Sequence, residues 1–377
     1  MVNPVEIQTD ALPTIHNVIH SYPKDYATTF PKHLHSKQAG GISSAIEPGG
    51  PSQMMDRRVV VGGLAASVLV RSAFAAAADE WPERPVRIVV PFSAGGAADT
   101  FGRFYADALS TAFGKQFFVE NKVGAGGMIA SEEVARAKPD GYTLMVSGIP
   151  THVLGPAMNK NVSFDPMRDF THIAFFGGAP NAFVLHPDFG ARSFADFMVR
   201  AKGESGGIEY VSAGVGTVGN WVAEYLAAKT GIKLVHVAYK GGANAVLDLI
   251  AGHVKVGMLT YSSVSEHVRS GALVPLVVTA SARLPQMPNV PTFRELGYPE
   301  LVATTWFALS GPAGLPPNIV ARINHEVVNA MDRPQMRKLM DQDAIETKAM
   351  SPAEVTQYFQ SEIDKWQPII ARIMTAK

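Results

Sequence analysis

Short apolar runs alternate with longer segments of helical periodicity along most of the chain after residue 85. The runs predict strands at 86–92, 116–120, 142–147, 208–212, 234–239, 254–260 and 273–279. The longer segments predict helices at 98–112, 128–137, 193–202, 219–230, 243–251, 262–270, 317–331, 334–342 and 352–374. Such alternation is typical of mostly parallel sheets with helices on both faces.

Two extended apolar segments, 173–185 and 301–310, lie at the ends of the second set of strands and helices. This placement predicts that the second set is inserted into the first and joined to it by two strands. We therefore expect an α/β fold of two lobes with mixed or parallel sheets, flanking helices and a two-strand hinge. Lobe 1 would comprise 79–178 plus 306–377, and lobe 2 would comprise 179–305. Two lobes on a hinge form a cleft that can close on a small ligand.

The residues before the first predicted strand resemble an export signal. Arg57-Arg58 precedes the apolar run 59–70, and small residues follow, including Ala73-Phe74-Ala75. The run is shorter than the roughly 20 residues that span a bilayer, so residues 54–78 predict a cleaved signal peptide, by the Sec or the Tat route. A core helix is the alternative. We expect residues 1–53 to be a disordered extension or not to be translated, and the mature protein to be periplasmic.

Composition excludes several classes of function. The chain has 33 Lys and Arg against 33 Asp and Glu, so its formal net charge is zero and nothing favours nucleic-acid binding. It has no cysteine, and no metal-binding or nucleotide-binding motif is complete. No nucleophile with a plausible base is visible. We expect a monomer that is not an enzyme and holds neither a cofactor nor a metal.

A glycine-rich turn follows the first predicted strand and opens a helix. Backbone N–H groups at such a turn have no helical partner and favour anions. The residues expected to form one wall of a binding site are Phe92, Ala94, Gly95, Gly96 and Asp99, with Ser147 and Thr151 from a later strand end. Residues 121–127 form a second glycine-rich turn in the same lobe. The alternative for each is a tight turn without a ligand.

Further candidates follow strands of the second set. Residues 214–219 contain G-x-G-x-x-G, but no acidic residue ends the next strand, so a dinucleotide site is disfavoured and a small-anion site is preferred. An aromatic ring, a cation and hydroxyl groups at neighbouring strand ends suit an anionic ligand, although a solvated lysine is the ordinary alternative. The second wall is expected to comprise Gly214, Gly216, Thr217, Asn220, Tyr239, Lys240 and Thr260.

Several of these segments occur in an order that resembles the substrate-binding proteins of tripartite tricarboxylate transporters, also called Bug proteins. The resemblance covers about 79–377 and rests on WPERPVRIVVPFSAGGAAD, VENKVGAGG, KPDGYTLMVS, GVGT, VAYKGGANAVLDLIAGHVKV, GALVPLVVTASARLPQMPNVPTFRELG and WFALSGPAGLPPNIV. It implies a type II, Venus-flytrap periplasmic binding protein that holds a small organic carboxylate through backbone amides and waters and delivers it to membrane permease subunits.

Two positions depart from the family pattern. Asn220 stands where the family usually has His, and Leu259-Thr260 stands where Phe-Asp is common. Without that acid we expect a ligand that lacks an amino group, such as an aromatic or aliphatic acid. The particular carboxylate does not follow from the sequence. Two other functions stay open, a ligand-sensing partner of a membrane signalling protein and an enzyme on the same scaffold.

Overall fold

The structure, a computed structural model, describes residues 81–159 and 161–375, with side chains up to residue 371. The predicted extension 1–53 and the predicted signal peptide 54–78 lie outside these described residues. Within these described residues, no helix has the length and apolar character needed to cross a membrane.

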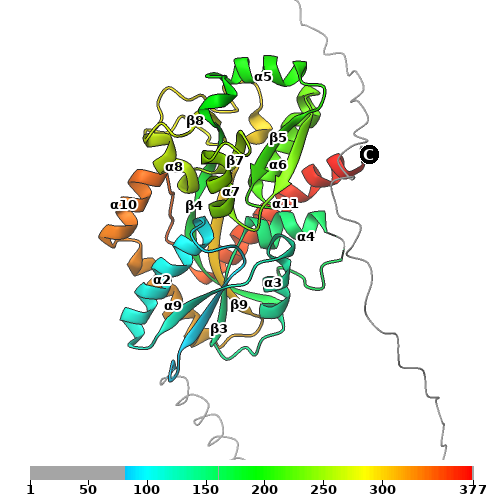
Figure 1. Ribbon diagram of the computed structural model, residues 1–377. Coiled ribbons are helices and arrows are strands. Elements are labelled where there is room, and N and C mark those ends of the chain that lie inside the picture. Colours follow the sequence, from blue (N-terminus) through cyan, green and yellow to red (C-terminus); the bar gives the residue numbers. More distant parts are fainter. Residues whose placement is uncertain (1–80, 160, 376–377) are drawn as a thin grey trace, which may run out of the picture. The chain divides into compact units, whose positions relative to one another are not determined.

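Strands and helices alternate along the described chain, as the sequence predicts (Figure 1). The strands are β1 Val86–Val90, β2 Phe117–Asn121, β3 Thr143–Gly148, β4 Phe170–Leu185, β5 Ile208–Ser212, β6 Leu234–Ala238, β7 Val256–Thr260, β8 Val274–Val278 and β9 Thr304–Pro312. The α-helices are α2 Ala97–Phe113, α3 Met128–Ala135, α4 Gly155–Met158, α5 Phe194–Gly203, α6 Val218–Thr230, α7 Gly242–Ile250, α8 Tyr261–Arg269, α9 Pro317–Ala330, α10 Pro334–Asp343 and α11 Pro352–Thr375.

Strand β4 belongs to two sheets and joins them. In the first sheet, β1 pairs in parallel with β2 and β3, while β9 runs antiparallel between β3 and residues 170–180 of β4. In the second, residues 181–185 of β4 run antiparallel to β7 and β8, and β5 pairs in parallel with β6 and β7. We call the first sheet with α2, α3 and α9 the first lobe, and the second sheet with α5–α8 the second lobe (Figure 1).

Local sequence explains where most elements begin and end. Helix α2 ends at Gly114, whose φ of 65° provides the left-handed cap that most side chains avoid. Ser193 begins α5 by accepting a hydrogen bond from the Asp196 N–H, and Thr217 begins α6 in the same way from Asn220. Strands β1 and β7 are buried along nearly their whole length, as expected for strands covered by helices on both faces.

One helical segment is not among the predicted elements. No helix is predicted between 142–147 and 193–202, but residues 150–154 form a π-helical turn that continues into α4. Pro150 occupies the first position of the turn, where a missing N–H costs nothing. His152 is buried, and burial together with the nearby His172 places its pKa well below the ordinary value, so the ring is neutral. The His152 ring packs among aromatic side chains, including Phe170 and Phe359, and this burial explains why the turn is helical and not a solvated loop.

Helix α11 contacts both lobes. Phe359 stacks on His172 of β4 with ring centroids 3.8 Å apart and lies 4.8 Å from the ring of Trp306 in β9. Near its far end, Trp366 meets Trp221 of α6 edge to face at 6.1 Å. The indole N–H groups of Trp306 and Trp366 both donate to the same carboxylate oxygen of Glu362, at 3.0 and 3.3 Å. The helix therefore fixes β9 in one lobe to α6 in the other.

Replacing Trp366 by Ala should lower the free energy of unfolding by about 3–5 kcal/mol, because it empties a buried indole site between the lobes. Gln367→Ala is the control, since this exposed neighbour should change stability by less than about 0.5 kcal/mol. Urea unfolding followed by tryptophan fluorescence and far-UV circular dichroism measures both. Equal stability of the two variants would contradict the bridging role of α11.

Candidate functional site

A cavity lies among residues of both lobes, at a place where four helices begin. Its volume, counted as the space open to the centres of water molecules, is about 30 Å³. A space of this size admits only solvent-sized groups, so a larger solute would need the two lobes to move apart. The lining residues are Phe92, Gly96, Ala97, Ala98, Pro150, Asn181, Ala213, Thr217, Gly219, Gly242, Met258, Leu259, Thr260, Ser263, Thr305 and Phe307.

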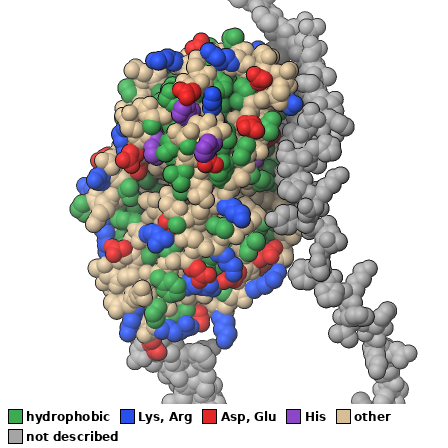
Figure 2. Space-filling model, viewed as in Figure 1, with side chains coloured by type: hydrophobic (Ala, Val, Ile, Leu, Met, Phe, Trp, Pro, Cys, Tyr) green, Lys and Arg blue, Asp and Glu red, His purple; other side chains and the backbone are tan. Residues whose placement is uncertain are grey.

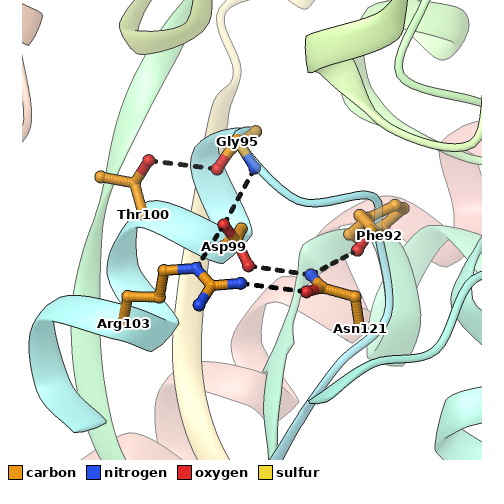
Figure 3. A network of polar contacts seen from close by, with 7 residues as sticks. Phe92, Gly95, Asp99, Thr100, Arg103 and Asn121 are labelled. Atoms are coloured by element: carbon orange, nitrogen blue, oxygen red, sulfur yellow. Dashed lines mark hydrogen bonds and ion pairs between the residues drawn. The ribbon is translucent and has the colours of Figure 1, made fainter. Parts of the chain in front are cut away.

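The first-lobe wall is the turn between β1 and α2, and Asp99 holds it in place (Figure 3). The buried Asp99 carboxylate accepts the Gly95 N–H at 2.9 Å and the Arg103 Nε–H at 2.8 Å on one oxygen. Its other oxygen accepts the Asn121 amide at 2.8 Å, and the same amide donates to the Phe92 carbonyl at 3.0 Å. The carboxylate thus supports the wall from behind and does not face the cavity.

Opposing effects act on the Asp99 carboxyl. Burial favours the neutral form and raises its pKa, but the hydrogen bonds from Arg103, Gly95 and Asn121 favour the ionised form more strongly. The net result is a pKa below the ordinary value for an aspartate. Asp99 is therefore ionised whenever the protein is folded near neutral pH.

The second-lobe wall includes the turn before α6, which a polar network supports. Asn220 accepts the Gly216 N–H on its side-chain oxygen at 3.2 Å and donates to the Tyr210 hydroxyl at 2.9 Å. The Asn220 amide nitrogen also lies 3.2 Å from Nδ1 of His236, whose Nε2 lies 2.7 Å from the Ser212 hydroxyl. Burial lowers the pKa of His236 to about 4, so the ring is neutral. Nδ1 then accepts from Asn220 and Nε2–H donates to Ser212.

Three of the four helix starts at the cavity lack a side-chain cap. Within the described part of the chain, no side chain hydrogen-bonds to the first N–H groups of α2, α7 or α8, which follow Gly96, Gly241 and Thr260. The first N–H groups of a helix have no acceptor within the helix and carry partial positive charge. Side chains of Lys, Arg, Asp, Glu and His do not occur among the described residues that line this cavity. The site is therefore uncharged in its side chains but rich in main-chain donors.

Four of the sequence-predicted residues line the cavity, namely Phe92, Gly96, Thr217 and Thr260. The structure does not bring the other ten to its surface, and three of them, Gly95, Asp99 and Asn220, support the walls as described above. Ser147 exchanges a hydrogen bond with Ser310 at 2.6 Å, and Thr151 donates to the Gly148 carbonyl at 3.3 Å, so both hydroxyls are engaged within the first lobe. The remaining predicted residues outside the lining are Ala94, Gly214, Gly216, Tyr239 and Lys240.

Tyr239 and Lys240 act through other contacts. The Tyr239 hydroxyl donates to Asp248, and burial together with this carboxylate raises the pKa of Tyr239 to about 12. The Lys240 side chain is exposed, while its carbonyl accepts the Ser93 N–H at 2.9 Å. This backbone hydrogen bond joins the first lobe to the second beside the cavity.

The glycine-rich turns also bring the two lobes into main-chain contact. A Cβ added to Gly126 would lie 2.5 Å from the Val215 carbonyl oxygen, and one added to Gly241 would lie 2.9 Å from the Ser93 nitrogen. The lobes can approach this closely only because side chains are missing at these points. The sequence predicts that glycine-rich turns favour an anion, and in the structure glycines also let the backbone of one lobe approach the other.

Several lining residues have no counterpart among the predicted ones. Asn181 and Thr305 lie inside the long strands β4 and β9, and Ser263 lies in the first turn of α8. Polar residues within otherwise apolar strands are the signal that could have found the first two. They were not predicted because only the residues at strand ends were considered as candidates.

The face of the molecule shown in Figure 2 carries no predominantly positive or negative patch, because acidic and basic side chains are interspersed on it. A metal site finds no support in the described residues, since no three His, Asp or Glu side chains lie together there.

Two α/β lobes around a small cavity at helix starts define the class of periplasmic-binding-protein folds. Solved structures agree. BugD, described as a periplasmic binding protein, superimposes with a TM-score of 0.73 at 28% identity over 78% of this chain and 98% of its own. MatC from Rhodopseudomonas palustris with bound malate gives 0.73 at 29% identity, covering 77% of this chain and 100% of its own. An R. palustris protein with adipate gives 0.73 at 28%, covering 78% and 97%.

The family model described as "Tripartite tricarboxylate transporter family receptor" matches residues 101–374, and the chain belongs to this family of solute-binding receptors. Among its relatives is a UPF0065 protein from the tcbD-tcbE intergenic region of Pseudomonas sp. strain P51. It is 32% identical over 315 residues, which is 83% of this chain and 94% of the relative. BugT of Bordetella pertussis is 29% identical over 313 residues, covering 83% and 94%.

Replacing Asp99 by Asn should destabilise the fold by about 1–3 kcal/mol at pH 7, because a buried, charge-assisted set of hydrogen bonds is lost. The folded-state pKa is depressed, so this stabilisation is present above about pH 4, the ordinary aspartate value, and is lost as pH falls through the folded pKa. Urea unfolding at pH 7, 4 and 3 should show the gap between wild type and variant shrinking. Arg103→Gln, at a half-exposed ion-pair partner, should cost less. A gap that widens at low pH would refute this account.

Gly126→Ala and Gly114→Ala form a matched pair, since both glycines have φ of 65° and pay the same backbone cost. Only the first places a methyl group against the other lobe. We expect Gly126→Ala to lose at least about 1 kcal/mol more than Gly114→Ala. Small-angle scattering should show a larger radius of gyration for Gly126→Ala alone. Equal stability loss in both would mean that the lobes do not depend on this contact.

Proposed function

We propose that this chain is an exported receptor that captures a small organic carboxylate between its two lobes and presents it to membrane permease subunits. The observation that carries the proposal is the cavity at the starts of α2, α6, α7 and α8. The first helix belongs to one lobe and the other three to the second. Their partial positive charges converge on a space that offers no charged side chain, which favours an anion held by neutral donors.

Relatives with known ligands support the class of solute. The solved neighbours named above were determined with malate and with adipate, both of which are small carboxylates. The carboxylate would bind main-chain N–H groups at the first turns of α2, α7 and α8, where side-chain caps are missing. The hydroxyls of Thr217, Thr260 and Ser263 would complete its shell. The predicted residues outside the cavity lining would act by shaping the two turns.

The lining also bears on which carboxylates fit. An ammonium group buried in this cavity would need an acidic partner, because an unpaired buried charge is costly. Thr260 occupies the end of β7, and no carboxylate of the described chain lines the space. A ligand without an amino group is therefore favoured, as the sequence suggests.

Capture would involve relative movement of the lobes. The proposed division places residues 79–178 and 306–377 in one lobe and 179–305 in the other, with β4 and β9 as the connections. Helices α10 and α11 contact the second lobe as well, through Arg269 to the Gln342 carbonyl and Trp221 to Trp366. These two helices would limit separation of the lobes on their own side. The lobes would therefore separate most between the glycine-rich turns, and we call this side of the cavity its mouth.

A receptor explains the lining better than an enzyme does. The reactive groups that face the cavity are hydroxyls of Ser and Thr, and a general base must lie within hydrogen-bond reach of the group that it activates. Neither His152 nor His236 lines the cavity, since His152 contacts Thr151 and His236 contacts Asn220 and Ser212. We propose binding without turnover, with delivery by a monomer to permease subunits, following export by way of residues 54–78.

The sign of the ligand charge can be tested at Ser263, which lies in the first turn of α8 and is only half-buried. Ser263→Asp and Ser263→Asn add side chains of the same size and differ by one negative charge. For an anion bound beside residue 263, about 4 Å from the added charge, the repulsion costs about 4 kcal/mol, so the Asp variant should bind at least about 100-fold more weakly than the Asn variant. Calorimetry with malate, adipate, short monocarboxylates and amino acids measures this. Equal affinities in the two variants, or preference for an amino acid, would refute the proposal.

A further inference from the structure

Strands β4 and β9, which pair side by side in the first sheet, each contribute one polar side chain to the cavity. Asn181 is 1% exposed and Thr305 is 5% exposed, and both side chains line the space. The Asn181 Nδ2–H donates to the Thr305 Oγ1 at 2.8 Å. Most of their neighbours along the strands are apolar and buried, and Thr260, which pairs with Asn181 from β7, is a further polar residue of the same lining. We call this part of the lining the floor of the cavity.

The main chain of Asn181 is fully occupied, which fixes where its side chain points. Its N–H donates to the Thr279 hydroxyl at 2.8 Å, and its carbonyl accepts the Thr279 N–H at 2.9 Å. The Thr279 hydroxyl in turn donates to the Ala303 carbonyl. The strand therefore cannot rotate Asn181 away from the cavity without breaking this set.

The side chains of the pair retain unused hydrogen-bonding groups. Asn181 has a carbonyl oxygen and a second N–H, and no group of the described chain pairs with either one. Thr305 uses its hydroxyl oxygen as an acceptor, so its hydroxyl proton is free to donate. Both residues line the cavity, so a ligand can hydrogen-bond to these groups, and a ligand without matching atoms leaves them unpaired.

The chemistry of these unused groups favours one kind of ligand atom. A hydroxyl can donate to the Asn181 oxygen and accept from the Thr305 hydroxyl at the same time. A second carboxylate only accepts, so it could take the Thr305 hydroxyl and the second Asn181 N–H but would leave the Asn181 oxygen without a donor. An alkyl terminus satisfies neither group.

We propose that Asn181 and Thr305 form a hydroxyl-recognising subsite at the floor of the cavity, so that the preferred ligand is a short hydroxycarboxylate. This inference rests on the proposed function, because the carboxylate end is assigned to the helix starts. It adds that the end of the ligand away from the carboxylate binds the strands that are proposed to connect the lobes. The residues that select the ligand therefore lie at the proposed hinge between the lobes.

The test compares ligands that differ by one oxygen. Butanoate, its 2-, 3- and 4-hydroxy derivatives and succinate are titrated against the wild-type protein by calorimetry. The best hydroxybutanoate should bind at least about tenfold more tightly than butanoate and than succinate. In Thr305→Val, which keeps the shape and removes the hydroxyl, this preference should fall below about threefold. Butanoate affinity itself should stay within about threefold.

Two further variants control the experiment. Thr171→Val makes the same chemical change on β4, where the Thr171 hydroxyl donates to the Pro312 carbonyl and does not face the cavity. This variant should keep the wild-type preference. Asn181→Leu should lose the preference as Thr305→Val does, and if it fails to fold, Thr305→Val still decides. Thermal unfolding monitors the fold of each variant.

The outcomes separate the two claims. Binding of carboxylates without a hydroxyl preference, or a preference that survives in Thr305→Val, overturns the subsite and leaves the receptor function in place. A preference for succinate overturns the subsite in the same way. Failure of every carboxylate to bind a folded wild-type protein overturns the proposed function together with the subsite.

Discussion

Direct main-chain contact between the two lobes is the constraint on which the cavity depends. The Ser93 N–H donates to the Lys240 carbonyl beside the mouth, and Gly126 faces the Val215 carbonyl without an intervening side chain. These contacts set the distance between the start of α2 in one lobe and the starts of α6, α7 and α8 in the other. A wider gap would leave the main-chain donors too far apart to act on one small molecule.

Rigid supports stand behind each wall, and they differ in kind. In the first lobe a buried, ionised carboxylate, Asp99, gathers donors from its own turn, its own helix and β2. In the second lobe a neutral network through Asn220 and His236 holds the turn before α6. Neither support faces the cavity. The protein thus keeps charge out of the space in which the walls meet while still using charge to shape one of them.

The sequence predicted the alternation of strands and helices well, because buried strands and capped helices leave strong local patterns. It also located Phe92, Gly96, Thr217 and Thr260, which lie where strands end or helices begin. It did not locate Asn181 or Thr305, since side chains inside a strand face a site only through pairing with distant strands. The helical turn at 150–158 was missed for a similar reason.

Some predicted residues turned out to serve the walls and not the cavity surface. Asp99 and Asn220 attract attention in the sequence as polar residues at helix starts, and nothing local tells whether such a side chain points outward or back into its own turn. The same holds for the glycines, whose missing side chains suit a ligand and a facing backbone equally. Only the three-dimensional arrangement of both lobes distinguishes these uses.

The uncharged lining has a consequence for how such a receptor responds to acidity. None of the side chains at the cavity changes its protonation between neutral and mildly acidic surroundings, and the neighbouring His236 stays neutral down to about pH 4. The binding surface therefore presents the same electrical environment across that range. Under the proposed function, the fraction of solute captured in an acidifying medium follows the ionisation of the solute itself. The ligand, and not the protein, is then the component that responds to acid.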